Sequence, residues 1–274
     1  MHKISFTKAV ASGNDFVIIE SSRRSPAAGR RSLAKKICDR KHGIGADGLL
    51  VLEKSKKADI KMRIFNADGS EAEMCGNGAR CVALYMSQQS IVHSPQKRIK
   101  IDTKAGVIES EVSGNNVKIK LTKPKDLKLN LPLKVNNRVL KVNFINTGVP
   151  HTVIFAQGLD KIDIFNLGRR IRYHKRFAPE GTNVDFVEVL GNTFIKVRTY
   201  ERGVEDETLA CGTGAVASAL LTAYSLQLTA YNKINVQTKG AEVLRVYFDR
   251  INNNFENIWL EGKVNIVCKG VYNV

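Results

Sequence analysis

The residues Cys75-Gly76-Asn77-Gly78-Ala79 begin an apolar run of the chain, and a similar stretch, Cys211-Gly212-Thr213-Gly214-Ala215, begins another one 136 positions later. Three further blocks keep nearly the same offset and order. Residues 13–18 match 148–153, residues 45–50 match 181–186, and residues 64–66 match 199–201. Four collinear matches indicate an internal repeat, which predicts two related domains.

Length and composition agree with two domains. The 274 residues suffice for two domains of about 135 residues each. With 43% hydrophobic and 25% charged residues, the chain can bury a core, which excludes a disordered chain, a collagen-like repeat and a disulfide miniprotein. Residues 122–134 hold two prolines and four lysines, which is typical of a connector. We therefore expect domains at 1–121 and 122–263, with a C-terminal strand at 264–274 that could belong to the first.

The hydrophobic periodicity predicts mostly strands, with few helices. Residues 79–88 and 215–227 are apolar on much of their helical circumference, so each is expected at the centre of its own sheet. Residues 32–39 and 167–174 are expected as surface helices. The expected strands are 4–10, 16–20, 49–53, 61–65, 98–103, 107–112 and 117–121, then 138–145, 152–155, 184–189 and 194–200.

The net charge of +17 raises the possibility of nucleic-acid binding. The basic residues, however, form short scattered clusters such as Lys54, Lys56 and Lys57, without a basic arm or a regular set of stacking aromatics. A solvated basic surface, which would also attract an anionic small substrate, is the favoured interpretation, so no nucleic-acid partner is expected. The first 20 residues alternate in polarity and no run of 18 apolar residues follows, which predicts a cytoplasmic protein without a membrane partner.

Five cysteines, with no Cys-x-x-Cys pair, disfavour both a disulfide framework and a zinc site, so no metal is expected. Cys38, Cys81 and Cys268 have apolar neighbours in sequence and are expected to be small core residues. Cys75 and Cys211 stand in glycine-rich settings instead.

A thiol directly before a helix lies at the positive end of the helix dipole. This position is expected to lower the cysteine pKa from its reference of about 8.5 and to offer backbone N–H groups to a carboxylate. A pseudo-twofold arrangement would place Cys75 and Cys211 on opposite sides of one molecule in an interdomain cleft. Such a pair suits inversion at a carbon next to a carboxylate, where one group accepts a proton and the other donates one. The alternative is two ordinary glycine-capped helix starts with packing cysteines.

Together these motifs resemble the diaminopimelate epimerase family. The residues that carry the resemblance are 65–70 leading to 75–80, then 181–183, 201–203 leading to 210–214, and 13–16 near the start. The resemblance implies an epimerase that needs no pyridoxal or other cofactor and interconverts LL- and meso-diaminopimelate in bacterial lysine and peptidoglycan synthesis. It also implies an α/β (α+β type) fold of two pseudo-symmetric domains, each a mostly antiparallel, barrel-like sheet around a central helix, and commonly a homodimer.

The resemblance assigns roles position by position. Cys75 and Cys211 match the acid and base pair, and His151 and Glu201 match residues that assist the thiols. The positions that match substrate contacts are Asn14, Asn66, Asn183, Glu201 and Arg202 for side chains, and Gly76, Asn77, Gly212 and Thr213 around the reacting centre. Without the family, His151 would more often be structural, and Glu201 beside Arg202 an ordinary ion pair.

The chain departs from the family pattern at three places. Val149 stands where some members have Asn, Gly48 where some have Gln, and the stretch 204–207 is one residue longer than usual, which leaves open how the distal end of the substrate is held. Proline and hydroxyproline racemases share the two-cysteine architecture but have His where this chain has Asn77. Phenazine-type isomerases lack the cysteine pair.

Overall fold

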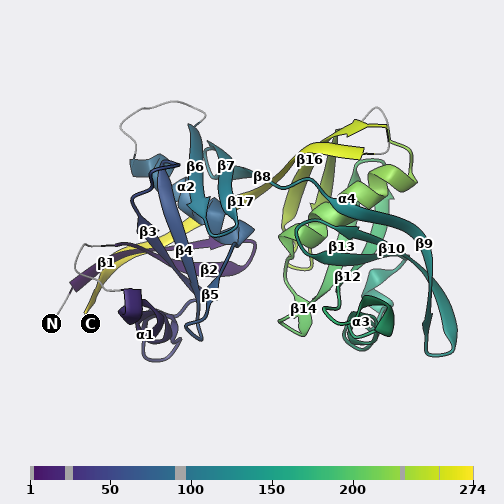
Figure 1. Ribbon diagram of the computed structural model, residues 1–274, viewed down its shortest axis with the longest axis horizontal. Helices are drawn as coiled ribbons and strands as arrows, with labels where there is room; N and C mark the ends of the chain where they lie inside the picture. The colour runs from purple at the N-terminus through teal and green to yellow at the C-terminus, as the bar shows by residue number, and fades with distance from the viewer. Residues whose placement is uncertain (1–2, 22–26, 90–96, 229–231, 253, 274) are drawn as a thin grey trace. The chain divides into compact units, whose positions relative to one another are not determined.

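The computed structural model describes residues 3–21, 27–89, 97–228, 232–252 and 254–273. The chain forms two compact units (Figure 1). The N-terminal unit comprises Met1–Lys120 with Glu261–Val274, and the C-terminal unit comprises Leu121–Leu260. The last strand therefore contributes residues to both units.

The elements of the N-terminal unit are β1 (Lys3–Ala11), β2 (Asn14–Glu20), α1 (Ala27–Cys38), β3 (Gly48–Glu53), β4 (Ile60–Asn66), β5 (Glu71–Ala72), α2 (Gly76–Gln89), β6 (Lys97–Thr103), β7 (Gly106–Ser113) and β8 (Asn116–Lys120). Those that follow are β9 (Lys125–Val135), β10 (Arg138–Asn146), β11 (Pro150–Phe155), α3 (Ile164–Arg172), β12 (Asn183–Gly191), β13 (Phe194–Glu201), β14 (Asp206–Thr208), α4 (Gly212–Ser225), β15 (Lys233–Gln237), β16 (Val243–Ile251) and β17 (Asn254–Asn273), with short 3₁₀ turns at Leu159–Lys161 and Lys175–Phe177.

The strands of the N-terminal unit pair in a closed ring. The order is β1, β2, β3, β4, β6, β7, β8 and β17, and β17 pairs again with β1. The β2–β3 and β4–β6 pairs are parallel. Helix α2 contacts β1, β2, β4, β6, β7 and β8, so it lies inside the ring.

The C-terminal unit repeats this arrangement. Strands β10 to β13 pair in sequence, with β11 and β12 parallel; β13 also pairs parallel with β15, and β15 pairs antiparallel with β16. Helix α4 contacts β10, β11, β12, β13, β15 and β16, so it is surrounded by the strands of its unit as α2 is. The predicted fold class, a mostly antiparallel, barrel-like sheet around a central helix in each of two similar domains, is confirmed.

Strand register corrects one part of the predicted repeat. Phe16 pairs with Gly48 and His151 pairs with Asn183, so both members of the pair shift by about 135 positions between the units. The predicted match of 45–50 with 181–186 is therefore wrong by one position within the strands. That match aligned Gly45 with Gly181, which lie in loops, whereas the equivalence of strand residues follows from the pairing of neighbouring strands. Asp185 corresponds to Leu50.

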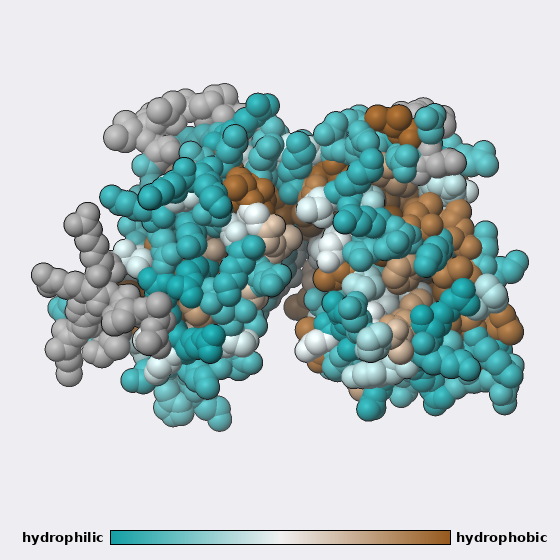
Figure 2. Space-filling model, viewed as in Figure 1, coloured by the Kyte–Doolittle hydropathy of each residue, from teal (hydrophilic) through white to brown (hydrophobic). Residues whose placement is uncertain are grey.

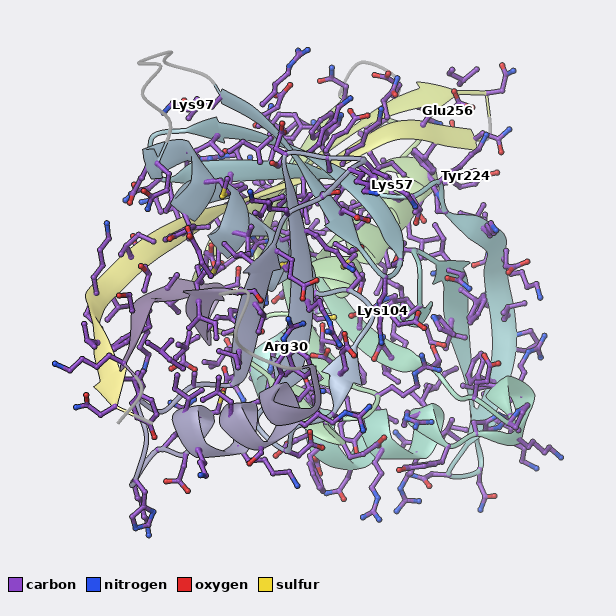
Figure 3. All side chains as sticks on the ribbon, turned by 60° about the vertical axis from the view of Figure 1, so that its left-hand side comes forward. Arg30, Lys57, Lys97, Lys104, Tyr224 and Glu256 are labelled. Atoms are coloured by element: carbon purple, nitrogen blue, oxygen red, sulfur yellow. The ribbon has the colours of Figure 1, made fainter. Side chains whose placement is uncertain are left out.

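The outer helices cover the sheets with one apolar face each. In the N-terminal unit, Leu33, Ala34 and Ile37 of α1 pack on a cluster that includes Val17 and Leu49. In the C-terminal unit, Ile164 and Ile171 of α3 pack with Val184, Phe186 and Tyr200. An ion pair between Arg30, which is labelled in Figure 3, and Glu53 also ties α1 to β3.

Two further expectations about the fold are wrong. The predicted connector 122–134 is largely β9, which pairs with β10. Its leucines at 127, 129, 131 and 133 recur with the period of a strand, and that pattern outweighs the lysines and prolines. The predicted central helices begin three residues too late, because the glycines near each thiol form the first helical turn.

Of the three cysteines expected in the core, Cys38 and Cys81 are buried, whereas Cys268 is exposed. It lies at an irregularity in the register between β1 and β17, which turns the strand locally. Hydrophilic side chains cover most of the visible face of both units (Figure 2). None of the helices in the described part of the chain is long and apolar enough to cross a membrane.

A repeated ion-pair triad ties the same strands in each unit. Arg63 forms a two-pronged bond with Glu71, at 2.8 and 2.9 Å, and Lys104 lies 3.1 Å from the same carboxylate (Figure 3). Arg198, Glu207 and Lys239 repeat the triad in the C-terminal unit. The Arg63 guanidinium, opposed by burial and assisted by Lys104, lowers the pKa of Glu71 to about 2.

Glu71→Gln is therefore expected to lower the free energy of unfolding by about 1–2 kcal/mol near neutral pH, because it removes a charge-assisted pair. The pKa is depressed in the folded state, so the stabilisation is complete above the ordinary pKa of 4.5 and disappears as the pH falls through about 2. Urea unfolding of both proteins between pH 7 and pH 2 measures the difference. Glu109→Gln is the control, since Glu109 is half exposed and 3.8 Å from Lys120. A Glu71 difference that does not shrink with acid would contradict this account.

Candidate active site

The thiol of Cys75 lies at the first turn of α2 in the N-terminal unit. The Gly78 N–H donates to its Sγ at 3.5 Å, and Asn14 Oδ1 lies 4.0 Å from the same sulfur. Cys75 is half-buried. A first-turn N–H has no partner within its helix, so it can donate to this sulfur.

The amide of Asn14 is held from behind by charged side chains. Its Nδ2 donates to Asp47 Oδ2 at 2.7 Å, which directs Oδ1 toward the thiol. Arg40 bridges Asp47 and Asp15 at 2.7 and 2.8 Å, and Lys8 lies 3.1 Å from Asp15. Burial would raise the pKa of Asp15, but the bonds from Arg40 and Lys8 lower it to about 2. The cluster therefore fixes the orientation of Asn14.

Two other predicted residues, Asn66 and Asn77, also lie in the N-terminal unit. The fully buried Arg80 donates to Asn77 Oδ1 at 2.8 Å and to Ser12 Oγ at 2.7 Å, tying the first turn of α2 to the loop before β2. Asn66 is exposed at the end of β4, where its Nδ2 donates to Ser70 Oγ at 2.9 Å.

Cys211 occupies the equivalent position before α4 but has different surroundings. Its side chain is buried, and its sulfur lies 3.5 Å from Thr213 Oγ1. Burial raises the thiol pKa well above its usual range, and the carboxylates of Glu201 and Asp185 raise it further, against the Thr213 hydroxyl and the Gly214 N–H. The expected lowering by the helix dipole is therefore wrong for this thiol, because burial and two carboxylates outweigh it.

His151 and Asn183 lie behind this thiol in a buried hydrogen-bonded chain. His151 Nδ1 is 2.7 Å from Asp185 Oδ2, and its Nε2 is 3.4 Å from Asn183 Nδ2. Asn183 Oδ1 accepts from the backbone N–H of Arg202 at 2.7 Å, and Asp185 Oδ1 accepts from Thr199 Oγ1 at 2.8 Å. His151 and Asp185 are fully buried.

Glu201 and Arg202 end β13 beside this chain. Both are half-buried. Burial raises the pKa of Glu201, with Asp185 acting in the same direction and His151 opposing it. Arg202 Nη1 donates to the Glu180 carbonyl at 3.3 Å. Glu201 and Arg202, both in the described part of the chain, do not form an ion pair, and the groups that act on Glu201 electrostatically include Cys211, His151 and Asp185.

Sequence reasoning missed the charged and polar residues that support the neighbours of each thiol, namely Asp185, Thr199, Arg80, Asp47 and Arg40. Asp185 carried a usable signal, since it interrupts the apolar strand run 184–189. A buried strand position seldom holds a carboxylate without a partner. Arg80 carried a similar signal within the apolar run after Cys75.

The two half-sites share one backbone but differ in chemistry. His151 takes the place of Phe16, Asp185 that of Leu50, and Glu201 that of Asn66. The N-terminal unit thus holds apolar or neutral side chains where the C-terminal unit holds titratable ones. Within the described residues, no group of three or more His, Cys, Asp or Glu side chains is arranged to hold a metal ion.

The fold is that of the two-domain epimerases and isomerases. A phenazine biosynthesis protein of the PhzF family from Bacillus anthracis has a TM-score of 0.76 at 16% identity, with both chains fully covered. A hydroxyproline epimerase from Agrobacterium vitis has a TM-score of 0.72 at 13% identity, covering 98% of this chain and 92% of the other.

Sequence comparison narrows the class to one family. The profile described as diaminopimelate epimerase matches residues 6–126 and 143–267. Diaminopimelate epimerase of Aquifex aeolicus is 41% identical, covering 97% of this chain and 96% of the relative, and that of Methanocella arvoryzae is 44% identical, covering 100% and 98%. The chain belongs to the diaminopimelate epimerase family and is an isomerase.

Replacing Gly214 with alanine is expected to destabilise the protein strongly. A Cβ there would lie 2.3 Å from Asp185 Oδ1, whereas one at the equivalent Gly78 would meet a leucine methyl, Leu50 Cδ2, at 3.2 Å. Alanine is favoured over glycine in a helix by about 1 kcal/mol at either position. The difference between the two variants therefore measures the cost of crowding the Asp185 carboxylate. We expect Gly214→Ala to lower the free energy of unfolding by about 2 kcal/mol more than Gly78→Ala, measured by urea unfolding. Equal losses would show that Asp185 does not crowd the helix.

Proposed function

We propose that the protein interconverts LL- and meso-diaminopimelate without a pyridoxal or metal cofactor, in lysine and peptidoglycan synthesis. The observation that carries the proposal is a thiol at the first turn of each of two equivalent helices, in a chain about 40% identical to diaminopimelate epimerases. Two monoprotic groups are what inversion at an acidic carbon requires, because each group serves one face.

The proposed reaction moves two protons. The thiolate of one cysteine takes the α-proton, so that the C–H bond breaks, an S–H bond forms and the electron pair passes into the adjacent carboxylate. The thiol of the other cysteine then donates its proton to the opposite face of the carbon. Each turnover leaves the two sulfurs with their protonation states exchanged, ready for the reverse reaction.

Burial and two neighbouring carboxylates favour the thiol form of Cys211. We therefore infer that Cys211 carries its proton in the unliganded protein. We assign His151 and Glu201 to assisting the thiols, and Glu201 is one of the two carboxylates that act on Cys211.

Substrate recognition is assigned to amide, guanidinium and backbone donors. The first-turn N–H groups near Gly76, Asn77, Gly212 and Thr213 suit the carboxylate at the reacting centre. Side chains that suit the remaining carboxylate and ammonium groups are those of Asn14, Asn66, Asn183, Glu201 and Arg202. At Gly48 a Cβ would lie 3.0 Å from the Phe65 carbonyl oxygen, so a side chain at this position would require a small local shift.

We also propose a homodimer in the cytoplasm. Val267 and Val271 are more than half exposed on β17, which gives the N-terminal unit an apolar strand surface that a second copy could cover. Sedimentation of the wild-type protein beside Val271→Lys tests the dimer: the charged variant is expected to sediment as a monomer. Identical sedimentation of the two proteins would exclude this surface as the dimer interface.

Incubation of the purified protein with LL-diaminopimelate in a buffer containing a metal chelator and no cofactor, followed by chiral chromatography, tests the activity. The expected product is meso-diaminopimelate. L-Proline and hydroxyproline serve as matched alternative substrates, because racemases of similar architecture act on them. Conversion of either in preference to diaminopimelate would refute the proposed substrate.

Cys75→Ala and Cys211→Ala are each expected to reduce epimerisation at least about 100-fold, since each removes a positioned acid or base. Cys268→Ala is the control; its thiol is exposed on β17, outside both half-sites, so full activity is expected. Steady-state rates from chiral chromatography supply the measurement. A Cys75 or Cys211 variant that keeps more than half of the activity would exclude that thiol.

A further inference from the structure

We propose that Asp185 is a positioning residue that fixes the proton of His151 on Nδ1 and, through the ring, the orientation of the Asn183 amide. The effect on catalysis rests on the proposed function, but the proton position does not. Neither the predicted half-site nor the roles carried over from the family includes Asp185.

The Arg202 backbone N–H determines which groups donate and which accept along the buried row of hydrogen bonds. A backbone N–H can only donate, so the atom of Asn183 that lies 2.7 Å from the Arg202 nitrogen must be its carbonyl oxygen. The amide NH₂ group of Asn183 therefore faces His151 Nε2, at 3.4 Å. Because an NH₂ group only donates, Nε2 must present its lone pair.

The other end of the chain requires the same arrangement. With Nε2 bare, the neutral imidazole carries its proton on Nδ1, which lies 2.7 Å from Asp185 Oδ2. An ionised carboxylate only accepts, and the second oxygen, Oδ1, accepts from Thr199 Oγ1 at 2.8 Å. Every bond from the Arg202 N–H to the Thr199 hydroxyl is satisfied with one proton placement, and reversing that placement at His151 sets a donor against a donor.

Burial leaves this chain few other partners. His151 and Asp185 are 0% exposed and Asn183 is 4% exposed, so bulk water does not compete for their hydrogen bonds. Removing a carboxylate from water is unfavourable unless it is fully hydrogen-bonded. The side chain is also confined, because a Cβ at Gly214 on α4 would lie 2.3 Å from its Oδ1.

The N-terminal unit shows that the fold does not need these polar groups. By strand register, Phe16, Gly48, Leu50 and Ile64 occupy the positions of His151, Asn183, Asp185 and Thr199. The same barrel is thus built with no polar side chain at any of the four positions. The chain of bonds is therefore specific to the half-site of Cys211, whose substrate contact Asn183 and assisting residue His151 it aligns.

Exchanging the carboxylate and the amide tests the proposal. In Asp185→Asn, the charge-assisted bond to Nδ1–H is lost. The new amide either accepts from Nδ1–H through a neutral oxygen while its NH₂ group donates to Thr199 Oγ1, or it donates to Nδ1 and sets Nε2–H against the Asn183 NH₂ group. In the double variant Asn183→Asp with Asp185→Asn, the new carboxylate at 183 accepts from both Nε2–H and the Arg202 N–H. Every bond is regained with the proton on the other nitrogen, and atoms and net charge are those of the wild type.

The measurement is ¹⁵N NMR of the histidine rings in unliganded protein, with the His151 signals identified by their loss in His151→Gln. The wild type is expected to show a protonated Nδ1 and a bare Nε2, and the double variant the reverse. The melting temperature is expected to fall in Asp185→Asn and to recover in the double variant. For Asp185→Asn we also expect kcat to fall at least about tenfold with a smaller change in KM.

A protonated Nε2 in the wild type, or a double variant as unstable as Asp185→Asn, would overturn the proposal. Because the NMR experiment uses no substrate, its result is independent of the proposed activity. A protein that places the proton on Nδ1 but does not convert diaminopimelate would refute the function and leave the role of Asp185 in the fold of this half-site intact.

Discussion

The first turn of a helix enclosed by a barrel is the constraint on which both half-sites depend. Its N–H groups have no partners within the helix, and the thiols of Cys75 and Cys211 are held directly beside them. The sheet must approach that turn closely, which is why Gly78 faces Leu50 and Gly214 faces Asp185. The close approach of sheet and helix therefore fixes the position of the thiol, and the same arrangement occurs in both units.

The two copies have diverged in electrostatics while keeping their geometry. Both retain the Arg–Glu–Lys triad that ties strand to strand, yet only the C-terminal unit buries His151 and Asp185 beside its thiol. Their burial is compatible with stability because each polar atom of the chain meets a partner of the opposite kind. In the C-terminal unit, burial and the carboxylates of Glu201 and Asp185 raise the pKa of the Cys211 thiol.

Much of this could be predicted from the sequence, because the strands, the central helices and the two cysteine motifs have local signatures. Strand β9 could not be predicted, because its lysines and prolines favoured a connector over its alternating leucines. Cys268 was wrongly expected in the core, because apolar neighbours in sequence do not show which way a side chain points from an irregular strand. The pKa direction of Cys211 was also beyond local reasoning. It depends on Glu201 and Asp185, which reach the thiol only through the pairing of β12 with β13.

The central claim is that two separate thiols exchange protons with one carbon. Turnover of LL-diaminopimelate in deuterated water, stopped early and analysed by mass spectrometry after chiral separation, tests it most directly. The account predicts solvent deuterium at the α-carbon of nearly all product and almost none in recovered substrate, because the abstracted hydrogen stays on the accepting sulfur. Deuterium in recovered substrate at a level comparable to that in product, or substrate hydrogen returned into product, would indicate a single base that serves both faces and would contradict the account.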